Sequence, residues 1–240
     1  MRRLVPGPQA DIDPFEAYDD QPGTWLRLGM VTSVDGSATD ERGRSGGLGG
    51  APDRQVFATL RALADAILVG AGTAASEGYG PHRPTAALRE RRVATGRPPF
   101  APIVVVTRSM RLDWTRDLFT AAPAPTIVLT CTDAAAGANP PAGVRLVVAG
   151  GAEVDLAEGI RQLRIHHGLD RLLCEGGPTL ATRLLASGLV DELCLTLAPS
   201  LLGTRYHTPL VRDLEHRVEF TLTALYEDRG VLLSRFRPAR

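Results

Sequence analysis

The stretch Leu60-Arg61-Ala62-Leu63-Ala64-Asp65-Ala66-Ile67-Leu68-Val69-Gly70-Ala71-Gly72-Thr73 (residues 60–73) decides the fold class. Its first residues end a helix, because apolar residues recur at helical spacing from Val56 to Leu63 after Pro52, a residue favoured in a first helical turn. The apolar run 66–69 then predicts a buried strand that leads directly into a glycine turn. A helix followed by a buried strand and a turn is the repeating unit of α/β proteins.

The rest of the chain continues this alternation of short apolar runs and helical patterns. Two further helices are expected, one between Asp155 and Gly168 and one between Pro178 and Gly188. At the end of the chain, 219–225 and 231–236 predict an antiparallel hairpin. The sequence therefore predicts an α/β fold with a mixed, mostly parallel sheet flanked by helices and a C-terminal antiparallel hairpin. The expected parallel strands are 25–32, 66–69, 103–107, 126–130, 144–149, 171–174 and 192–197.

Domain organisation follows from the absence of repeats and of long linkers in the sequence. The stretches 81–102 and 133–143, rich in Pro, Ala and Gly, are short enough to be loops. We expect an N-terminal extension, residues 1–24, and one domain, residues 25–240. A zinc deaminase domain is not expected, because His-x-Glu with a downstream Pro-Cys-x-x-Cys does not occur.

Composition excludes several function classes. The 240 residues carry 27 basic and 27 acidic side chains, so no overall positive field favours nucleic acid or a membrane surface. All the basic residues are arginine, which excludes lysine Schiff-base chemistry and a phosphate-loop lysine. The three cysteines form no Cys-x-x-Cys pair and no metal site is expected. The first twenty residues have no signal-peptide pattern, which favours a cytoplasmic location.

Two glycine turns that follow expected strands are candidates for holding phosphate groups. The first contains Gly70, Gly72 and Thr73, and the second runs from Glu175 to Thr179. A strand that enters glycines and then a helix leaves backbone N–H groups free at the positive end of the helix dipole. Two such turns could grip a dinucleotide, although a single one is commonly only a turn.

A third group predicts which dinucleotide is bound. Thr107, Arg108 and Ser109 follow the expected strand 103–107 and offer a cation between two hydroxyls. An adenosine 2′-phosphate requires such charge-assisted hydrogen bonds, so NADPH is favoured over NADH; a solvated loop arginine is the other interpretation. Ser33 and Asp35 follow the first parallel strand and could face a substrate or form an ordinary Asp-Gly turn.

Several motifs occur together in one order: Thr32-Ser33-Val34-Asp35-Gly36, residues 60–70, Gly72-Thr73, Glu175-Gly176-Gly177-Pro178-Thr179-Leu180 and residues 188–193. This series resembles the RibD C-terminal domain family, the pyrimidine reductases of riboflavin biosynthesis, over roughly residues 25 to 236. The resemblance implies a dihydrofolate-reductase-like fold and a homodimer. It also implies NADPH-dependent reduction of 5-amino-6-(5-phosphoribosylamino)uracil, with a ribityl chain in the product.

The resemblance also implies site residues. Asp35 and Glu175 are the candidate catalytic acids, and Arg61 suits a sugar phosphate because its planar fork binds oxygens bidentately. Ser33, Asp35, Arg61, Glu77, Arg83 and Glu175 form the expected substrate set. Thr32, Gly70, Gly72, Thr73, Thr107, Arg108, Ser109, Gly176, Gly177, Pro178, Thr179 and Leu180 form the expected cofactor set.

One segment departs from the family pattern, which usually has Asp-Asp-Pro and an arginine after the Gly-Thr pair. Here Glu77 keeps one acid and Arg83 keeps the arginine, while the second acid and the proline are replaced. A pterin such as dihydrofolate is therefore an alternative substrate. A non-catalytic NADPH-binding protein is the alternative from another class.

Overall fold

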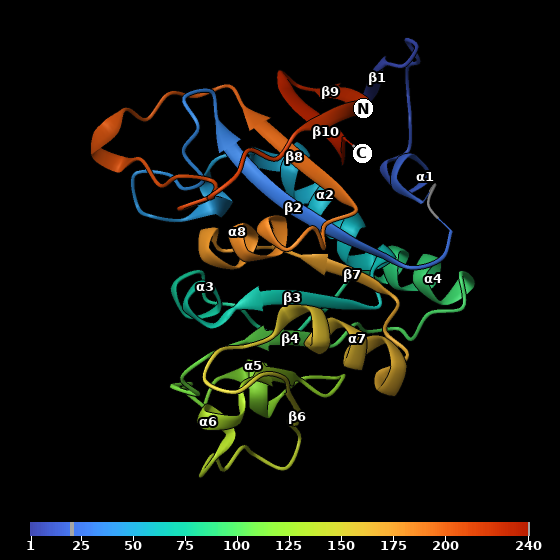
Figure 1. Cartoon of the computed structure of the whole chain (residues 1–240). Helices are drawn as coiled ribbons and strands as arrows, with labels where there is room; N and C mark the ends of the chain where they lie inside the picture. The colour runs from blue at the N-terminus through green and yellow to red at the C-terminus, as the bar shows by residue number, and fades with distance from the viewer. Residues whose placement is uncertain (20–21, 240) are drawn as a thin grey trace.

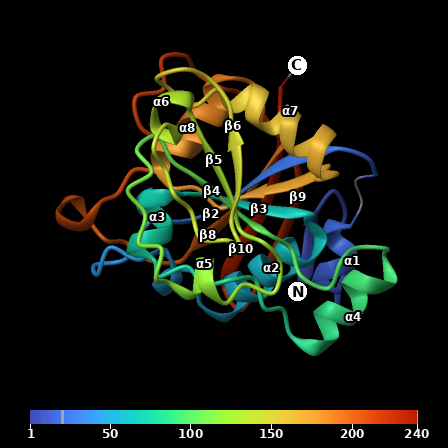
Figure 2. The same cartoon turned by 90° about the horizontal axis from the view of Figure 1, so that it is seen from below.

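The strands of this computed structural model owe their places to apolar residues that alternate between two buried faces. In β3 (Ala66–Gly70), Ala66 and Leu68 pack on one side of the sheet, and Ile67 and Val69 pack on the other. A strand whose side chains are buried on both faces belongs inside a sheet covered by two helical layers. Figure 2 shows these layers, with α7 (Leu156–His167) and α8 (Pro178–Ala186) on one side of the sheet.

Residues 1–19 and 22–239, which the structure describes, contain a ten-stranded sheet in the order β1-β9-β10-β8-β2-β7-β3-β4-β5-β6 (Figure 1). Neighbouring strands run parallel from β8 to β6, and β1, β9 and β10 complete the sheet in antiparallel pairing. The remaining strands are β1 (Arg2–Val5), β2 (Trp25–Ser33), β4 (Ile103–Val106), β5 (Ile127–Thr130), β6 (Arg145–Val148), β7 (Arg171–Cys174), β8 (Glu192–Ala198), β9 (Phe220–Asp228) and β10 (Val231–Pro238).

The second face of the sheet is covered by helices from the first half of the chain. Figure 2 shows α1 (Pro14–Tyr18), α2 (Gly50–Leu63), α4 (Ala86–Ala94) and α5 (Asp117–Thr120) on this side. Helix α2 packs Val56, Leu60 and Leu63 against Leu173 of β7. The shorter elements are α3 (Ala71–Ser76), α6 (Thr132–Ala135) and the 3₁₀ turns Ser45–Gly47 and Thr204–Tyr206.

The fold class expected from the sequence is confirmed, including the hairpin of β9 and β10. Helix α7 begins and ends at the residues that the sequence indicated. At its start the Asp155 carboxylate accepts a hydrogen bond from the Glu158 N–H, and at its end Gly168 takes a left-handed φ of 65°. No helix in the described part of the chain is long and apolar enough to cross a bilayer.

The residues before Trp25 contribute to the fold in two ways that their sequence did not predict. Strand β1 pairs with β9 at one edge of the sheet. Helix α1 buries Phe15 and Tyr18 in the same apolar cluster as Trp25. The segment is thus attached to the sheet through both backbone pairing and side-chain burial.

A buried ion cluster joins β2, β8 and β10. The Glu192 carboxylate lies 2.6 Å from Arg27 Nε and 2.7 Å from an Nη of Arg235, and each of the three side chains is at most 3% exposed. The cluster ties the antiparallel edge of the sheet to the parallel strands through side chains as well as through backbone hydrogen bonds.

Candidate active site

A cavity of about 740 Å³ lies between α2, the strands β2, β3 and β4, the turn after β7, and the segment 76–85. Its wall includes Arg61, Glu77, Arg83 and Glu175 of the expected substrate set. It also includes Thr73, Gly177 and Pro178 of the expected cofactor set. The structure therefore brings seven of the candidate residues, which lie up to 117 positions apart in the chain, to one cavity.

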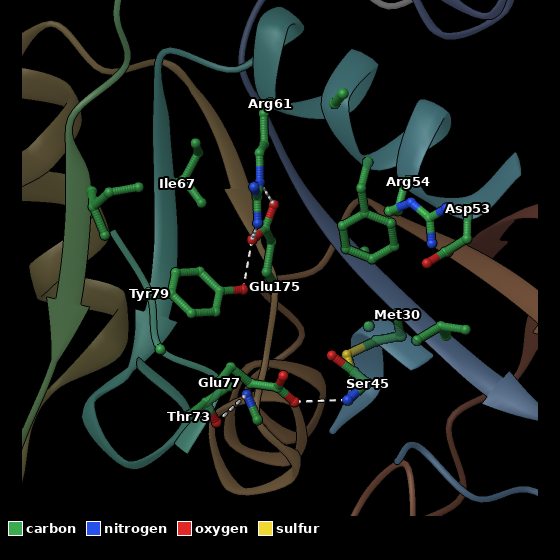
Figure 3. A pocket seen from close by; sticks show the side chains of 18 of the residues that line it. Met30, Ser45, Asp53, Arg54, Arg61, Ile67, Thr73, Glu77, Tyr79 and Glu175 are labelled. Carbon is green, nitrogen blue, oxygen red and sulfur yellow. Dashed lines mark hydrogen bonds and ion pairs between the residues drawn. The ribbon is translucent and has the colours of Figure 1, made fainter. Parts of the chain in front are cut away.

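Arg61 and Glu175 form a bidentate ion pair at the centre of the cavity wall (Figure 3). Arg61 Nε lies 2.6 Å from Glu175 Oε1 and Arg61 Nη2 lies 2.7 Å from Oε2. Helix α2 supplies the arginine in its last turn, and the glutamate directly follows β7. Two parallel bonds hold the carboxylate in one orientation, which a single contact would not do.

Tyr79 completes this group, although the sequence analysis did not select it. Its hydroxyl donates to Glu175 Oε2 at 2.7 Å, and its ring lies 5.7 Å from the Arg61 guanidinium carbon. Burial and the negative charge of Glu175 raise the pKa of Tyr79 well above that of a free tyrosine. The charge of Glu175 likewise raises the pKa of Arg61. Tyr79 therefore remains a neutral hydrogen-bond donor and Arg61 a cation at any physiological pH.

The two glycine turns lie against each other beside this group. The Gly70 N–H donates to the Gly176 carbonyl at 3.0 Å, and the Gly177 N–H donates to Thr73 Oγ1 at 3.1 Å. Gly176 has a φ of 87°, a conformation that favours glycine. Within residues 1–19 and 22–239, neither α3 nor α8 has a side-chain cap at its N-terminus, so backbone N–H groups of both first turns are left for other acceptors.

These turns offer backbone N–H groups that could hold the diphosphate of a dinucleotide. Two uncapped helix starts meet where the turns cross, and the exposed Thr179 lies in the first turn of α8. The Leu180 side chain belongs to the hydrophobic core, so only its backbone could face a ligand.

Thr107, Arg108 and Ser109 lie outside the cavity wall, after β4. Thr107 Oγ1 accepts from the N–H groups of Ser109 and Met110 and so shapes the turn. The Arg108 side chain is 67% exposed and lies 2.6 Å from Glu153 Oε1. An arginine that binds a 2′-phosphate here would exchange this carboxylate for the phosphate.

Thr32, Ser33 and Asp35 lie at the end of β2 and are also absent from the cavity wall. Asp35 accepts from the Ser33 hydroxyl at 2.5 Å and from the N–H groups of Leu202 and Gly203 at 3.0 and 2.7 Å. These hydrogen bonds lower the pKa of Asp35 to about 2. Asp35 is therefore an ionised group that anchors the loop after β8. The Thr32 hydroxyl donates to the neighbouring Ser33 carbonyl at 3.1 Å.

Glu77 closes the cavity on the side of the glycine-rich segment 43–50. Its Oε1 accepts from the Ser45 N–H at 2.8 Å (Figure 3). Arg83 is exposed and donates to the Ala121 carbonyl at 2.7 Å. Glu77 thus connects the end of α3 to the segment that precedes α2.

Two further titratable side chains of the cavity wall were missed by the sequence analysis. His82 is buried and accepts the Ala101 N–H on Nδ1 at 3.1 Å. Burial and the nearby Arg92 and Arg61 lower the pKa of His82 to about 4, so the imidazole is neutral. Asp53 is 6% exposed. Neither residue belongs to a recognisable motif, and only their burial in the folded chain distinguishes them.

The model of the RibD C-terminal domain matches residues 24–233. The chain belongs to this family. A 2,5-diamino-6-ribosylamino-4(3H)-pyrimidinone 5′-phosphate reductase of Archaeoglobus fulgidus is 31% identical over 198 residues, which cover 80% of this chain and 87% of that protein. The riboflavin biosynthesis protein RibD of Aquifex aeolicus is 26% identical over 191 residues, 79% of this chain and 50% of the other.

A solved member of comparable length supports the same assignment. The crystal structure of a pyrimidine reductase-like protein from Corynebacterium diphtheriae superimposes with a TM-score of 0.80 at 26% identity, covering 95% of this chain and all of the other. The family expected from the sequence motifs is therefore confirmed. The relatives reported for this family are thus reductases of the riboflavin-biosynthesis type.

Proposed function

We propose that this chain reduces a 6-ribosylaminopyrimidine 5′-phosphate with NADPH and converts the ribosyl group into a ribityl chain. The uracil form, 5-amino-6-(5-phosphoribosylamino)uracil, is the substrate implied by the sequence resemblance. The 2,5-diaminopyrimidinone form is the one in the name of the Archaeoglobus relative. The observation that carries the proposal is the Arg61–Glu175–Tyr79 group, which lies beside two uncapped helix N-termini.

The proposed cofactor residues are those of the two turns. The N–H groups at the starts of α3 and α8, with Thr73, Gly177 and Thr179, would hold the diphosphate of NADPH. Arg108, between Thr107 and Ser109, would meet the 2′-phosphate after leaving Glu153. When bound, NADPH supplies the hydride of the reduction.

The chain's own residues would handle phosphate and protons. The bidentate pair with Glu175 uses Nε and Nη2 of Arg61, and Nη1 would bind an oxygen of the sugar phosphate. Glu175 would hold or deliver the proton that the ribosylamine nitrogen needs, since it lies in the cavity wall with Tyr79 on one oxygen. Asp35, the other candidate acid, would act by holding the 202–203 loop in place, because a group with a pKa near 2 donates protons poorly at neutral pH.

The test is oxidation of NADPH by the purified protein, followed by the loss of nicotinamide absorbance. The assay compares the two phosphoribosylaminopyrimidines with dihydrofolate. Turnover of either pyrimidine supports the proposal. Turnover of dihydrofolate alone would instead support the pterin alternative, and NADPH binding without any turnover would support the non-catalytic alternative.

Two further parts of the proposal concern the state of the protein in solution and in the cell. We infer a homodimer located in the cytoplasm, acting on a small molecule and not on nucleic acid or a membrane. Light scattering of the purified protein gives its mass directly, and a monomer at assay concentration would contradict the first of these points.

A further inference from the structure

Arg92, on α4, is a buried cation whose hydrogen-bond partners are backbone carbonyls. Helix α4 lies beside α2 (Figure 2), and Arg92 is 0% exposed. Its Nη1 donates to the carbonyls of Arg61 and Ala62 at 3.3 and 3.0 Å, and also to the Ala64 carbonyl. Its Nε donates to the Pro98 carbonyl at 2.5 Å. Burial of a guanidinium costs free energy, so a charge kept here indicates that these contacts have a specific role.

The three carbonyls that Nη1 contacts lie at the end of α2, where the helix has no donors of its own for them. Helix α2 ends at Leu63, and the last carbonyls of an α-helix have no partner within the helix. The Asp65 N–H would bond to the Arg61 carbonyl if the helix continued, but it donates to the Arg171 carbonyl at 2.7 Å. Arg92 therefore caps the C-terminus of α2, and its positive charge suits the negative end of the helix dipole.

The same last turn of α2 carries a side chain from the centre of the candidate active site. Arg61 is held at two points, since its carbonyl accepts from Arg92 and its guanidinium donates to Glu175. The Arg61 side chain is 38% exposed, so packing alone does not fix it. Helix ends fray when their terminal groups lack partners. Opening of the last turn would move the Arg61 backbone, while Glu175 would stay on the turn after β7.

We propose that Arg92 is a positioning residue for substrate binding, which holds the last turn of α2 so that the Arg61 guanidinium meets the phosphate of the substrate. The inference rests on the proposed function, in which Arg61 binds that phosphate. It adds a residue that acts through Arg61 without touching substrate or cofactor. The hydrogen bonds of Arg92 in the described part of the chain reach the end of α2 and Pro98, and not the two glycine turns. Binding of NADPH should therefore not depend on Arg92.

The first test is the effect of Arg92→Met on the two KM values. Methionine fills much of the buried space but removes the charge and every donor. We expect KM for the phosphoribosylaminopyrimidine to rise about tenfold, less than the roughly 100-fold that a 1 Å misplacement can cost, and KM for NADPH to stay unchanged. Arg91→Met is the matched control, because Arg91 is on the same helix but pairs with Asp13. No rise in Arg92→Met, or an equal rise in Arg91→Met, would overturn the inference.

A double-mutant cycle with Arg61→Ala separates positioning from a general loss of stability. If Arg92 acts through Arg61, then Arg92→Met should raise KM for the pyrimidine in the wild-type background and leave it unchanged in Arg61→Ala. An equal rise in both backgrounds would overturn the inference. If Arg92→Met does not fold, Arg92→Lys takes its place in the cycle. Lysine keeps the cation with fewer donors, so we expect about a threefold rise that likewise disappears in Arg61→Ala.

The Nε–H resonance of Arg61 in NMR spectra gives a measurement that does not require turnover. In the wild-type protein this group donates to Glu175 at 2.6 Å, so it should exchange slowly with water. Its loss in Arg61→Ala assigns it. We expect Arg92→Met to shift or broaden the resonance and Arg91→Met to keep it. Absence of turnover in the wild-type protein would contradict the proposed function, while a shift confined to Arg92→Met would still support the positioning role. A resonance that Arg92→Met leaves unchanged would overturn the inference, even in an active reductase.

Discussion

The Gly177 N–H donates a hydrogen bond to Thr73 Oγ1 at 3.1 Å and so joins the turn after β3 to the turn after β7. The two turns come from adjacent strands, and the Gly70 N–H bond to the Gly176 carbonyl supports the same contact. Two hydrogen bonds, one of them from the Gly177 N–H to the Thr73 hydroxyl oxygen, thus hold the two helix N-termini next to each other. A dinucleotide that uses both turns would require both residues.

Thr73→Val removes this hydrogen bond with little change in volume. Loss of one neutral hydrogen bond of about 1 kcal/mol predicts an NADPH dissociation constant about fivefold higher. Fluorescence titration with NADPH measures it, and Thr221→Val on the exposed face of β9 is the control. An unchanged dissociation constant in Thr73→Val would show that the cofactor does not use this contact.

Arg61→Ala should weaken both the fold and substrate binding. The Glu175 side chain is 1% exposed and would keep only the Tyr79 hydroxyl among the partners described above. The Arg61 side chain is 38% exposed, so we expect a loss of about 2 kcal/mol, less than for a fully buried pair. KM for the pyrimidine should rise more than kcat falls. Urea unfolding and steady-state kinetics measure the two effects, with Arg89→Ala on α4 as control; an unchanged KM would exclude a phosphate role.

Glu175→Gln tests which acid takes part in proton transfer. If Glu175 supplies or holds the proton, kcat should fall by on the order of 100-fold, with a smaller change in KM. Asp35→Asn should keep most of kcat but loosen the 202–203 loop, because Asp35 accepts both N–H groups of that loop. Full turnover in Glu175→Gln, together with loss of turnover in Asp35→Asn, would reverse this assignment.

His82 should make the stability of the protein depend on pH. Its pKa is about 4 in the folded state against 6.5 for a free histidine, so the unfolded chain binds more protons between these values. The neutral His82 therefore makes its full contribution to the free energy of unfolding above pH 6.5. This contribution decreases by up to about 3 kcal/mol as the pH falls to 4.

His82→Asn separates this effect from other titrations. Asparagine Oδ1 can still accept the Ala101 N–H, so the loop contact is kept. We expect His82→Asn to match the wild-type urea midpoint above pH 6.5, to show a smaller slope between pH 6.5 and 4, and therefore to have the higher midpoint at low pH. His216→Asn, at an exposed position, should follow the wild-type curve. Parallel curves for all three proteins would disprove the role of His82.

The buried ion cluster of Arg27, Glu192 and Arg235 should lose more stability on substitution of one member than other polar groups of the sheet. Glu192→Leu leaves Arg27 and Arg235 buried without their carboxylate and should cost about 3 to 5 kcal/mol. Replacing all three residues, by Arg27→Met, Glu192→Leu and Arg235→Met, should cost much less, because no buried charge remains. Thermal unfolding of the single and triple variants measures the difference. A triple variant no more stable than Glu192→Leu would contradict this explanation.

The sequence predicted the elements whose signals are local. The ends of α7 depend on Asp155 and Gly168, which act within one helical turn, so the sequence predicted both ends. Arg61 and Glu175 were found through motif resemblance, since 114 positions separate them and no local pattern relates the two. The antiparallel strand β1 has only four residues and pairs with β9, more than 200 positions away, so nothing near it in the chain indicates a strand.

The remaining site residues depend on burial that exists only after folding. Asp53 and His82 are ordinary polar residues in the sequence, and their properties arise from the strands and helices packed around them. Arg108 illustrates the same limit, because its partner Glu153 belongs to the loop after β6. Local spacing predicts which residues follow a strand, but not which of them face a common cavity.

Strand β1 limits how the N-terminus can be truncated or tagged. Because it pairs with β9, it occupies backbone hydrogen-bonding groups that would otherwise form an open sheet edge. Trimming the first ten residues to simplify an expression clone would uncover that edge and favour strand-to-strand aggregation. An affinity tag joined directly to Met1 would begin one residue before a paired strand, so a flexible spacer is the better choice for purification and for surface immobilisation.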